Sequence, residues 1–152
     1  MSVRIYLDNC CYNRPYYDQT QLRISLESQA KLYIQELIRE NRFELVTSYI
    51  LVYENSRNRT AAKREAILRY IEDCSSIYVD VSRSDDVQML AESVARTGIK
   101  PFDSLHTACA ILAGCDYLLT TDDRLLRYVD DRIRIINPTE FVRLIDGGDI
   151  SV

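Results

Sequence analysis

Four acidic residues in this chain stand where apolar strands or helical segments begin or end, and their types and spacing could support chemistry. They are Asp8 in IYLDNCCYN, Glu54 in SYILVYENS, Asp103 in KPFDSLHTA and Asp122 in YLLTTDDRLL. Carboxylates that share a pocket resist ionising together, and a hard divalent cation removes that conflict. Because all the ligands are oxygens, Mg²⁺ or Mn²⁺ is favoured over zinc. We therefore predict a metal site that hydrolyses phosphodiester bonds with a metal-activated water.

Local structure offers an alternative explanation for some of these acids. Asp8 could form a turn at a strand end, and Asp103 could cap the helix that follows it. Thr120 and Asp123 fit a capping box. Glu54 is harder to explain in this way, because a glutamate in a mostly apolar segment points towards covered surface, where an unpaired charge is costly.

The elements that must position these acids alternate between short β-rich runs and longer helical patterns. This order predicts a three-layer α/β/α fold with a central five-stranded parallel sheet. The functional crevice of such a sheet lies beyond the carboxyl ends of its strands, near the point where strand order reverses, which suits Asp8 and Asp122. We expect a polar loop over 9–21, strands over 3–7, 43–47, 77–81, 117–119 and 133–136, and helices over 22–40, 49–55, 61–74, 84–96, 103–113, 123–128 and 138–145.

Composition limits the class of protein. A chain of 152 residues, with 47% hydrophobic and 28% charged residues, fits one domain, which we place at 1–146 with a frayed tail at 147–152. No apolar run approaches the ~20 residues that span a membrane, and the N-terminus lacks a signal-peptide pattern, so we expect a cytoplasmic protein. The net charge of −4 excludes nucleic-acid binding by bulk positive charge.

The five cysteines include no C-x-x-C pair and indicate buried thiols rather than a disulfide framework. A zinc site built from Cys10, Cys11 and the only histidine, His106, is a weaker alternative, because the ligand spacing does not support it. His106 lies one helical turn after Asp103 and shares its face. We expect it to support the site rather than to bind metal.

Taken together, these motifs resemble those of PIN-domain endoribonucleases, the fold of VapC-type toxins. The resemblance covers roughly residues 3–142 and is carried by the strand ending at Asp8, by Glu54, by D-S-L-H-T-A from Asp103 and by D-Y-L-L-T-T-D from Asp116. It implies a Mg²⁺- or Mn²⁺-dependent nuclease that cuts single-stranded RNA, often as a homodimer. It also implies a possible small antitoxin whose C-terminal tail plugs the acidic site.

The resemblance also implies roles for individual residues. Asp8, Glu54, Asp103 and Asp122 match the catalytic acids, and the three aspartates are the metal ligands. Thr120 matches the threonine whose hydroxyl supports the last acid.

This sequence departs from the family pattern at two places. The first motif often has a hydroxyl residue shortly after the aspartate, where this chain has Asn9, Cys10 and Cys11, so Asn9 is expected to take the polar role. The last motif commonly has an acid two places on, where this chain has Arg124. Asp123 is therefore only a supporting candidate beside Asp122.

The basic candidates for RNA contact are Arg14, Arg57 and Arg59. Two other functions remain open. One is a non-catalytic PIN-fold interaction protein. The other is a phosphoacceptor-aspartate protein, which is disfavoured because position 10 is Cys10 rather than an acid and Asn137 follows the last strand where a receiver domain would have a lysine.

Overall fold

The computed structural model describes residues 2–152 and contains a five-stranded sheet in the order β3-β2-β1-β4-β5. All neighbouring strands pair in parallel. This confirms the predicted fold class. The strands are β1 (Val3–Leu7), β2 (Phe43–Ser48), β3 (Ile77–Val79), β4 (Tyr117–Leu119) and β5 (Arg134–Ile136).

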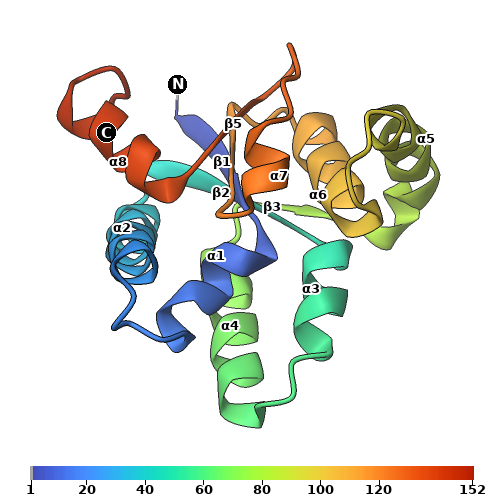
Figure 1. The fold of residues 1–152 in the computed structure, drawn as a ribbon. Coiled ribbons are helices and arrows are strands. Elements are labelled where there is room, and N and C mark those ends of the chain that lie inside the picture. Colours follow the sequence, from blue (N-terminus) through green and yellow to red (C-terminus); the bar gives the residue numbers. More distant parts are fainter. Residues whose placement is uncertain (1) are drawn as a thin grey trace.

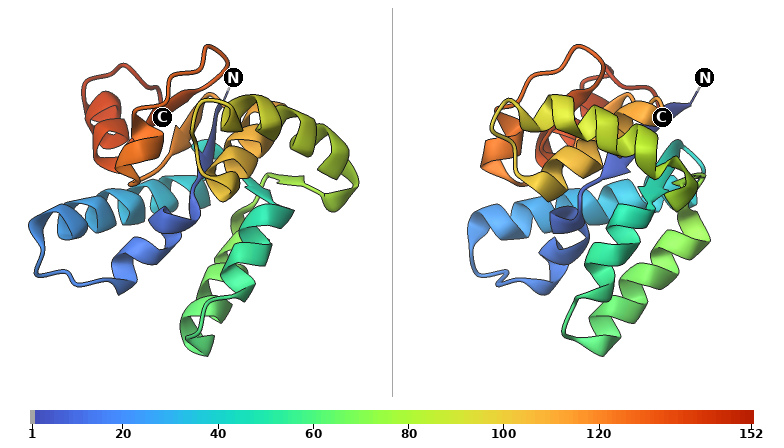
Figure 2. Two further views of the ribbon diagram at one scale, coloured as in Figure 1. Left: turned by 45° about the vertical axis from the view of Figure 1, so that its right-hand side comes forward. Right: turned by 90° about the vertical axis from the view of Figure 1, so that its right-hand side faces the viewer.

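Helices cover both faces of the sheet. Figure 1 shows α2 and α8 on one side and α5 and α6 on the other, and Figure 2 shows α3 and α4 side by side. No helix in residues 2–152 is long and apolar enough to cross a bilayer. The helices are α1 (Asn9–Asn13), η1 (Arg14–Tyr16), α2 (Leu22–Arg39), α3 (Tyr49–Ser56), α4 (Ala61–Cys74), η2 (Val81–Arg83), α5 (Ser84–Ala95), α6 (Pro101–Leu112), α7 (Asp123–Leu126) and α8 (Pro138–Asp146).

Alternation along β1 divides the core into two clusters, because successive strand residues point to opposite faces of the sheet. Ile5 and Leu7 pack into the cluster that includes residues of α1, α2, α4 and α8. Tyr6 lies in the other cluster, with residues of α3, α5 and α6. Burial on both faces explains why the central strands read as apolar runs.

The strand order reverses between β1 and β4. The chain runs from β1 outward through β2 to β3, and then returns to place β4 and β5 on the other side of β1. At the carboxyl ends of this central pair, the Asp8 amide donates to the Leu119 carbonyl at 2.9 Å. Ligands of parallel α/β sheets bind at such a reversal point, so the fold places Asp8 there.

The structure corrects several expected boundaries. Residues 9–21, predicted as a loop, contain α1 and η1, because the Asp8 side chain caps α1 and a helix of five residues shows no apolar periodicity. The third strand ends at Val79 rather than at Val81, where η2 begins. Beyond α8, Ile150 is buried, and its N–H donates to the Leu144 carbonyl.

Candidate active site at the carboxyl ends of β1 and β4

Asp8 is a buried carboxylate held by its own loop and by the strand beside it. Its side chain is the N-cap of α1, and Oδ1 accepts the Asn9 amide at 2.7 Å. Its other oxygen, Oδ2, accepts the Thr120 hydroxyl at 2.8 Å. With only 4% of its surface exposed, Asp8 is fixed in position by partners from both central strand ends.

Asp122 joins the same place from the β4 side. It is the N-cap of α7, and its Oδ1 accepts the amides of Arg124 at 2.9 Å and Leu125 at 3.0 Å. The Asp122 amide donates to the Thr120 hydroxyl at 3.1 Å, so one threonine connects both aspartates. Asp122 itself therefore caps this helix, and the expected capping box from Thr120 to Asp123 is wrong.

Asp103 completes a set of three aspartates. It lies in the first turn of α6, whose N-cap is Lys100, so its expected role as N-cap is wrong. The helix begins at Pro101, because proline suits the first helical position. Burial, together with the negative charges of Asp8 and Asp122, raises the pKa of Asp103 to about 6. The fold therefore brings three acids within electrostatic reach of one another.

Glu54 is attached to the site through His106. His106 Nε2 is hydrogen-bonded to Glu54 Oε1 and lies 3.9 Å from Asp8 Oδ1. Burial by itself lowers the pKa of His106, but the bond to Glu54 and the negative charges of Asp8 and Asp103 outweigh burial and raise it. The histidine therefore stands as an internal counter-charge between the acids.

Two residues that the sequence did not single out fix the other side of this histidine. The Tyr6 hydroxyl lies 2.5 Å from His106 Nδ1 and 2.7 Å from the Ser48 hydroxyl, and all three side chains are fully buried or nearly so. Ser48 also caps α3, the helix that carries Glu54. A hydrogen-bond chain thus runs from Ser48 through Tyr6 and His106 to Glu54. In the sequence Tyr6 looks like any other strand residue, so its hydrogen bond to His106 could be found only from the structure.

Asn9 and Asp123 occupy different surroundings. The Asn9 side-chain amide is 3.5 Å from Glu54 Oε2, which places it beside that carboxylate. The Asp123 carboxylate instead forms two hydrogen bonds with Arg23, at 2.9 and 2.8 Å. Asp123 is exposed and paired away from the other acids. Of the two adjacent aspartates, Asp122 therefore lies with the other acids, and Asp123 pairs with Arg23 instead.

The three basic candidates also differ in their availability. Arg14 pairs with the buried carboxylate of Glu27 at 2.7 Å, and only 16% of its side chain is exposed. Arg57 and Arg59 are exposed in the connection between α3 and α4. That connection is attached to α1 through a hydrogen bond from Asn58 to Asn13 at 3.2 Å.

Glu27 is a third residue that the sequence did not reveal. Its carboxylate is 2% exposed and accepts from Arg14, Arg23 and the Asn137 side chain. Arg23 also donates to the Thr121 carbonyl at 2.9 Å. Because Thr121 precedes Asp122, this buried network supports the loop that carries one of the acids.

The donor set fits a hard divalent cation better than a soft one. Within residues 2–152, no three His, Cys, Asp or Glu side chains stand in a ready-made ligand geometry. The carboxylates are instead occupied by protein donors, namely the α7 amides at Asp122 and the histidine at Glu54. Asp122 Oδ2 accepts no hydrogen bond from the described residues, and the repulsion at Asp103 marks excess negative charge.

The acids lie apart from a large hollow of the surface. A cavity of about 700 Å³ is found at the amino ends of the strands, lined by Arg4, Glu44 and Asp116 among others. It contains none of the four acids, because they gather at the opposite ends of the strands.

Comparison with solved structures shows that chains of other proteins share this fold, one of them from the VapBC family of toxin–antitoxin systems. The matched chain of VapBC2 from Rickettsia felis, bound to a DNA fragment from its promoter, is 16% identical with a TM-score of 0.57, over 89% of this chain and 98% of that one. A chain of FitAcB from Neisseria gonorrhoeae is 18% identical with a TM-score of 0.56, over 88% and 97%. A chain of VapBC-5 from Mycobacterium tuberculosis is 18% identical with a TM-score of 0.52, over 89% and 98%.

Sequence comparison gives the family. Comparison with curated protein sequences gave no match. The family model of the PIN domain matches residues 20–131, a range that includes Glu54, Asp103 and Asp122 and begins after Asp8. This range is well over half of the 152 residues, and the fold agrees with it. The chain therefore belongs to the PIN domain family.

Proposed function

We propose that this protein is an endoribonuclease that depends on Mg²⁺ or Mn²⁺ and hydrolyses phosphodiester bonds of single-stranded RNA. The observation that carries the proposal is the electrostatic coupling of Asp8, Asp103 and Asp122 at the reversal point of the sheet. Membership of the PIN domain family, whose members are generally nucleases, supports the reaction class. Oxygen-only ligands support the choice of metal.

Each residue has a role in this proposal. Asp8, Asp103 and Asp122 hold the cation, which when bound makes water more acidic and offsets the negative charge of the phosphate. Thr120 fixes Asp8 by its hydrogen bond and holds the start of the Asp122 loop. Glu54 orients the attacking water and accepts its proton.

The first test is RNA cleavage by the purified protein. We expect Mn²⁺ to support cleavage of a labelled single-stranded RNA, chelation by EDTA to abolish it, and Asp8→Asn to remove it while the far-UV circular dichroism spectrum stays unchanged. Equal cleavage by Asp8→Asn would sink the assignment of the site. No cleavage by the wild type with any divalent metal would favour the alternative, a non-catalytic interaction protein on the PIN fold.

The two adjacent aspartates provide a matched pair of variants. Asp122→Asn is expected to abolish cleavage, because the proposal makes this side chain a metal ligand. Asp123→Asn is expected to keep most of it, because its carboxylate pairs with Arg23 instead. The reverse result would move the last ligand to Asp123.

We further propose that the protein is the toxin of a toxin–antitoxin pair and forms a homodimer. The structural neighbours named above support this only by fold, since they are 16–18% identical to this chain and VapBC-5 belongs to a family of toxin–antitoxin systems. We expect a small open reading frame beside the gene. Its product should block both RNA cleavage by this protein and the growth arrest that strong expression of this protein causes. Light scattering coupled to gel filtration would give the oligomeric state. Growth unaffected by strong expression would favour RNA processing.

A further inference from the structure

The cation–π contacts found in residues 2–152 gather in one region, between η1, α2 and α4. Elsewhere in the described residues, several arginines pair with acids, as Arg132 does with Asp130. We name this region the cation–aromatic groove. The contacts join Lys31 to Tyr12 at 5.5 Å, Arg39 to Tyr70 at 5.1 Å, Lys63 to Tyr16 at 5.5 Å and to Tyr17 at 5.4 Å, and Arg14 to Tyr17 at 5.8 Å.

The floor of the groove holds a buried lysine without an anion. Lys31 is 5% exposed and forms no ion pair or hydrogen bond with the described residues. The Tyr12 hydroxyl beside it is also buried and has no hydrogen-bond partner there. Buried charges in proteins are normally paired, because an unpaired one loses its hydration without compensation. The Lys31 ammonium could therefore bind an anionic group of a ligand.

A cavity beside Lys31 has room for such a group. It measures about 190 Å³ and is lined by Tyr12, Tyr16, Lys31, Arg39 and Tyr70 among others. This volume is small against the roughly 300–1,000 Å³ of typical ligand pockets. It suits one phosphate group and excludes a whole nucleotide. Of the two cations that line this cavity, Lys31 has no acid partner in residues 2–152, and Arg39 pairs with Glu36 at 3.3 Å on the surface.

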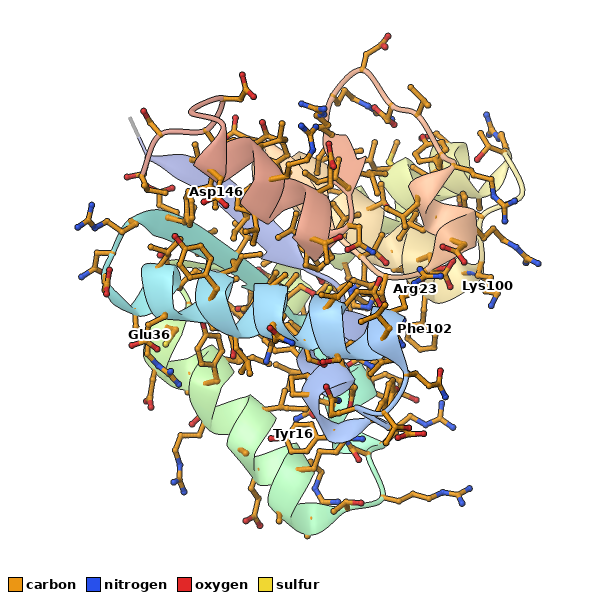
Figure 3. All side chains as sticks on the ribbon, turned by 60° about the vertical axis from the view of Figure 1, so that its left-hand side comes forward. Tyr16, Arg23, Glu36, Lys100, Phe102 and Asp146 are labelled. Atoms are coloured by element: carbon orange, nitrogen blue, oxygen red, sulfur yellow. The ribbon has the colours of Figure 1, made fainter. Side chains whose placement is uncertain are left out.

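The mouth of the groove presents flat rings to solvent. Tyr16 is 50% exposed and Tyr17 is 43% exposed, and the ammonium of Lys63 lies over both. In Figure 3, Tyr16 lies between the α1–η1 segment and α4. Exposed rings beside cations are the combination with which proteins bind single-stranded nucleic acid, because bases stack on the rings while phosphates meet the cations.

The groove lies next to the carboxylates. Tyr12 belongs to α1, the helix of five residues that Asp8 caps, and such a helix is only about 7–8 Å long. A strand with its phosphate at Lys31 therefore reaches the carboxylates within a few nucleotides. Arg14, by contrast, is paired with Glu27 and is less available to RNA than Lys31 or Lys63.

We propose that the cation–aromatic groove binds the single-stranded RNA beside the cleaved bond, with one phosphate at Lys31 and bases stacked on Tyr16 and Tyr17. This inference rests on the proposed nuclease function and names the surface that holds its substrate. The groove is selective for single strands, because the bases of a duplex are stacked on each other and not free to cover the tyrosines.

Binding without cleavage tests this directly. A labelled single-stranded RNA of about twelve nucleotides is titrated with the Asp8→Asn protein in EDTA, and fluorescence anisotropy gives the affinity. Tyr16→Ala and Lys63→Ala are each expected to weaken binding about tenfold, which is within the range for loss of one base–aromatic stack. Tyr16→Phe is expected to restore binding. The matched control is Tyr33→Ala, since Tyr33 is 44% exposed on α2 and makes none of these contacts.

Other outcomes separate this inference from the nuclease proposal. If the wild type cuts no RNA while the groove variants still lose binding, the groove stands and the nuclease proposal falls. If the groove variants bind RNA as the parent does, or if duplex RNA competes as well as single-stranded RNA, the inference is overturned. Loss of binding to an acidic protein partner, with RNA binding intact, would also overturn it.

Discussion

Replacing Lys31 with methionine is expected to stabilise the protein at neutral pH. Burial lowers the pKa of Lys31 from 10.5 to about 8. At about 1.36 kcal/mol per pKa unit, the charged form destabilises the fold by about 3 kcal/mol. Because the folded pKa lies below the unfolded one, this cost is fully present below about pH 8 and disappears as pH rises towards 10.5. Methionine keeps an apolar stem beside Tyr12 without the charge.

Urea denaturation of both proteins over a range of pH measures this effect. The variant should exceed the wild type by about 3 kcal/mol near pH 7 and by only about 1.4 kcal/mol near pH 9.5. Comparing the two proteins cancels the titration of the tyrosines and cysteines that they share. Arg39→Met, at an exposed position of the same groove, should show no such pH dependence. A difference that stays constant with pH, or a less stable variant, would refute the reasoning.

Three further predictions follow from buried contacts. Glu27→Ala should lower the free energy of unfolding, measured by urea titration, by about 3 kcal/mol, because it leaves buried donors unpaired. In the same titration Glu140→Gln should change little, because the ion pair that it loses is exposed. Tyr6→Phe should cost about 1–2 kcal/mol and slow RNA cleavage, because two buried hydrogen bonds are lost; cleavage at the wild-type rate would show that the chain to Glu54 is only structural. Asp103→Asn should raise the melting temperature in EDTA by relieving repulsion and reduce the rise that Mn²⁺ produces; a lower melting temperature in EDTA would contradict the coupling of the acids.

The architecture could be predicted because its signals are local and strong. The apolar run at Ile5–Leu7 lies in strand β1, and the periodic pattern from Leu22 forms helix α2. Helix α1 could not be predicted, because its cap, the Asp8 carboxylate, was equally suited to a turn. In such a short helix, tertiary contacts decide the conformation, and they leave no periodic pattern.

The acidic residues of the candidate site could be predicted from the sequence, but the residues that hydrogen-bond to the site and hold it in place could not. Carboxylates at the ends of apolar segments are visible in a sequence, and Asp8, Asp103 and Asp122 do come together. Tyr6 and Glu27 look like an ordinary strand tyrosine and a helix-surface glutamate. Their roles depend on partners far along the chain, such as Asn137 at a separation of 110 residues for Glu27. No local rule carries that information.

The hydrogen bond between Thr120 and Asp8 joins residues that are 112 positions apart. Since β4 must insert beside β1 before these groups meet, the first half of the chain holds an aspartate without its companions. Synthesis from the N-terminus therefore delivers β1, β2 and β3 while the carboxylate cluster is still incomplete. A nascent chain has no assembled cluster until residue 122 has left the ribosome, so any activity that depends on these carboxylates can begin only after β4 and the loop behind it have been synthesised.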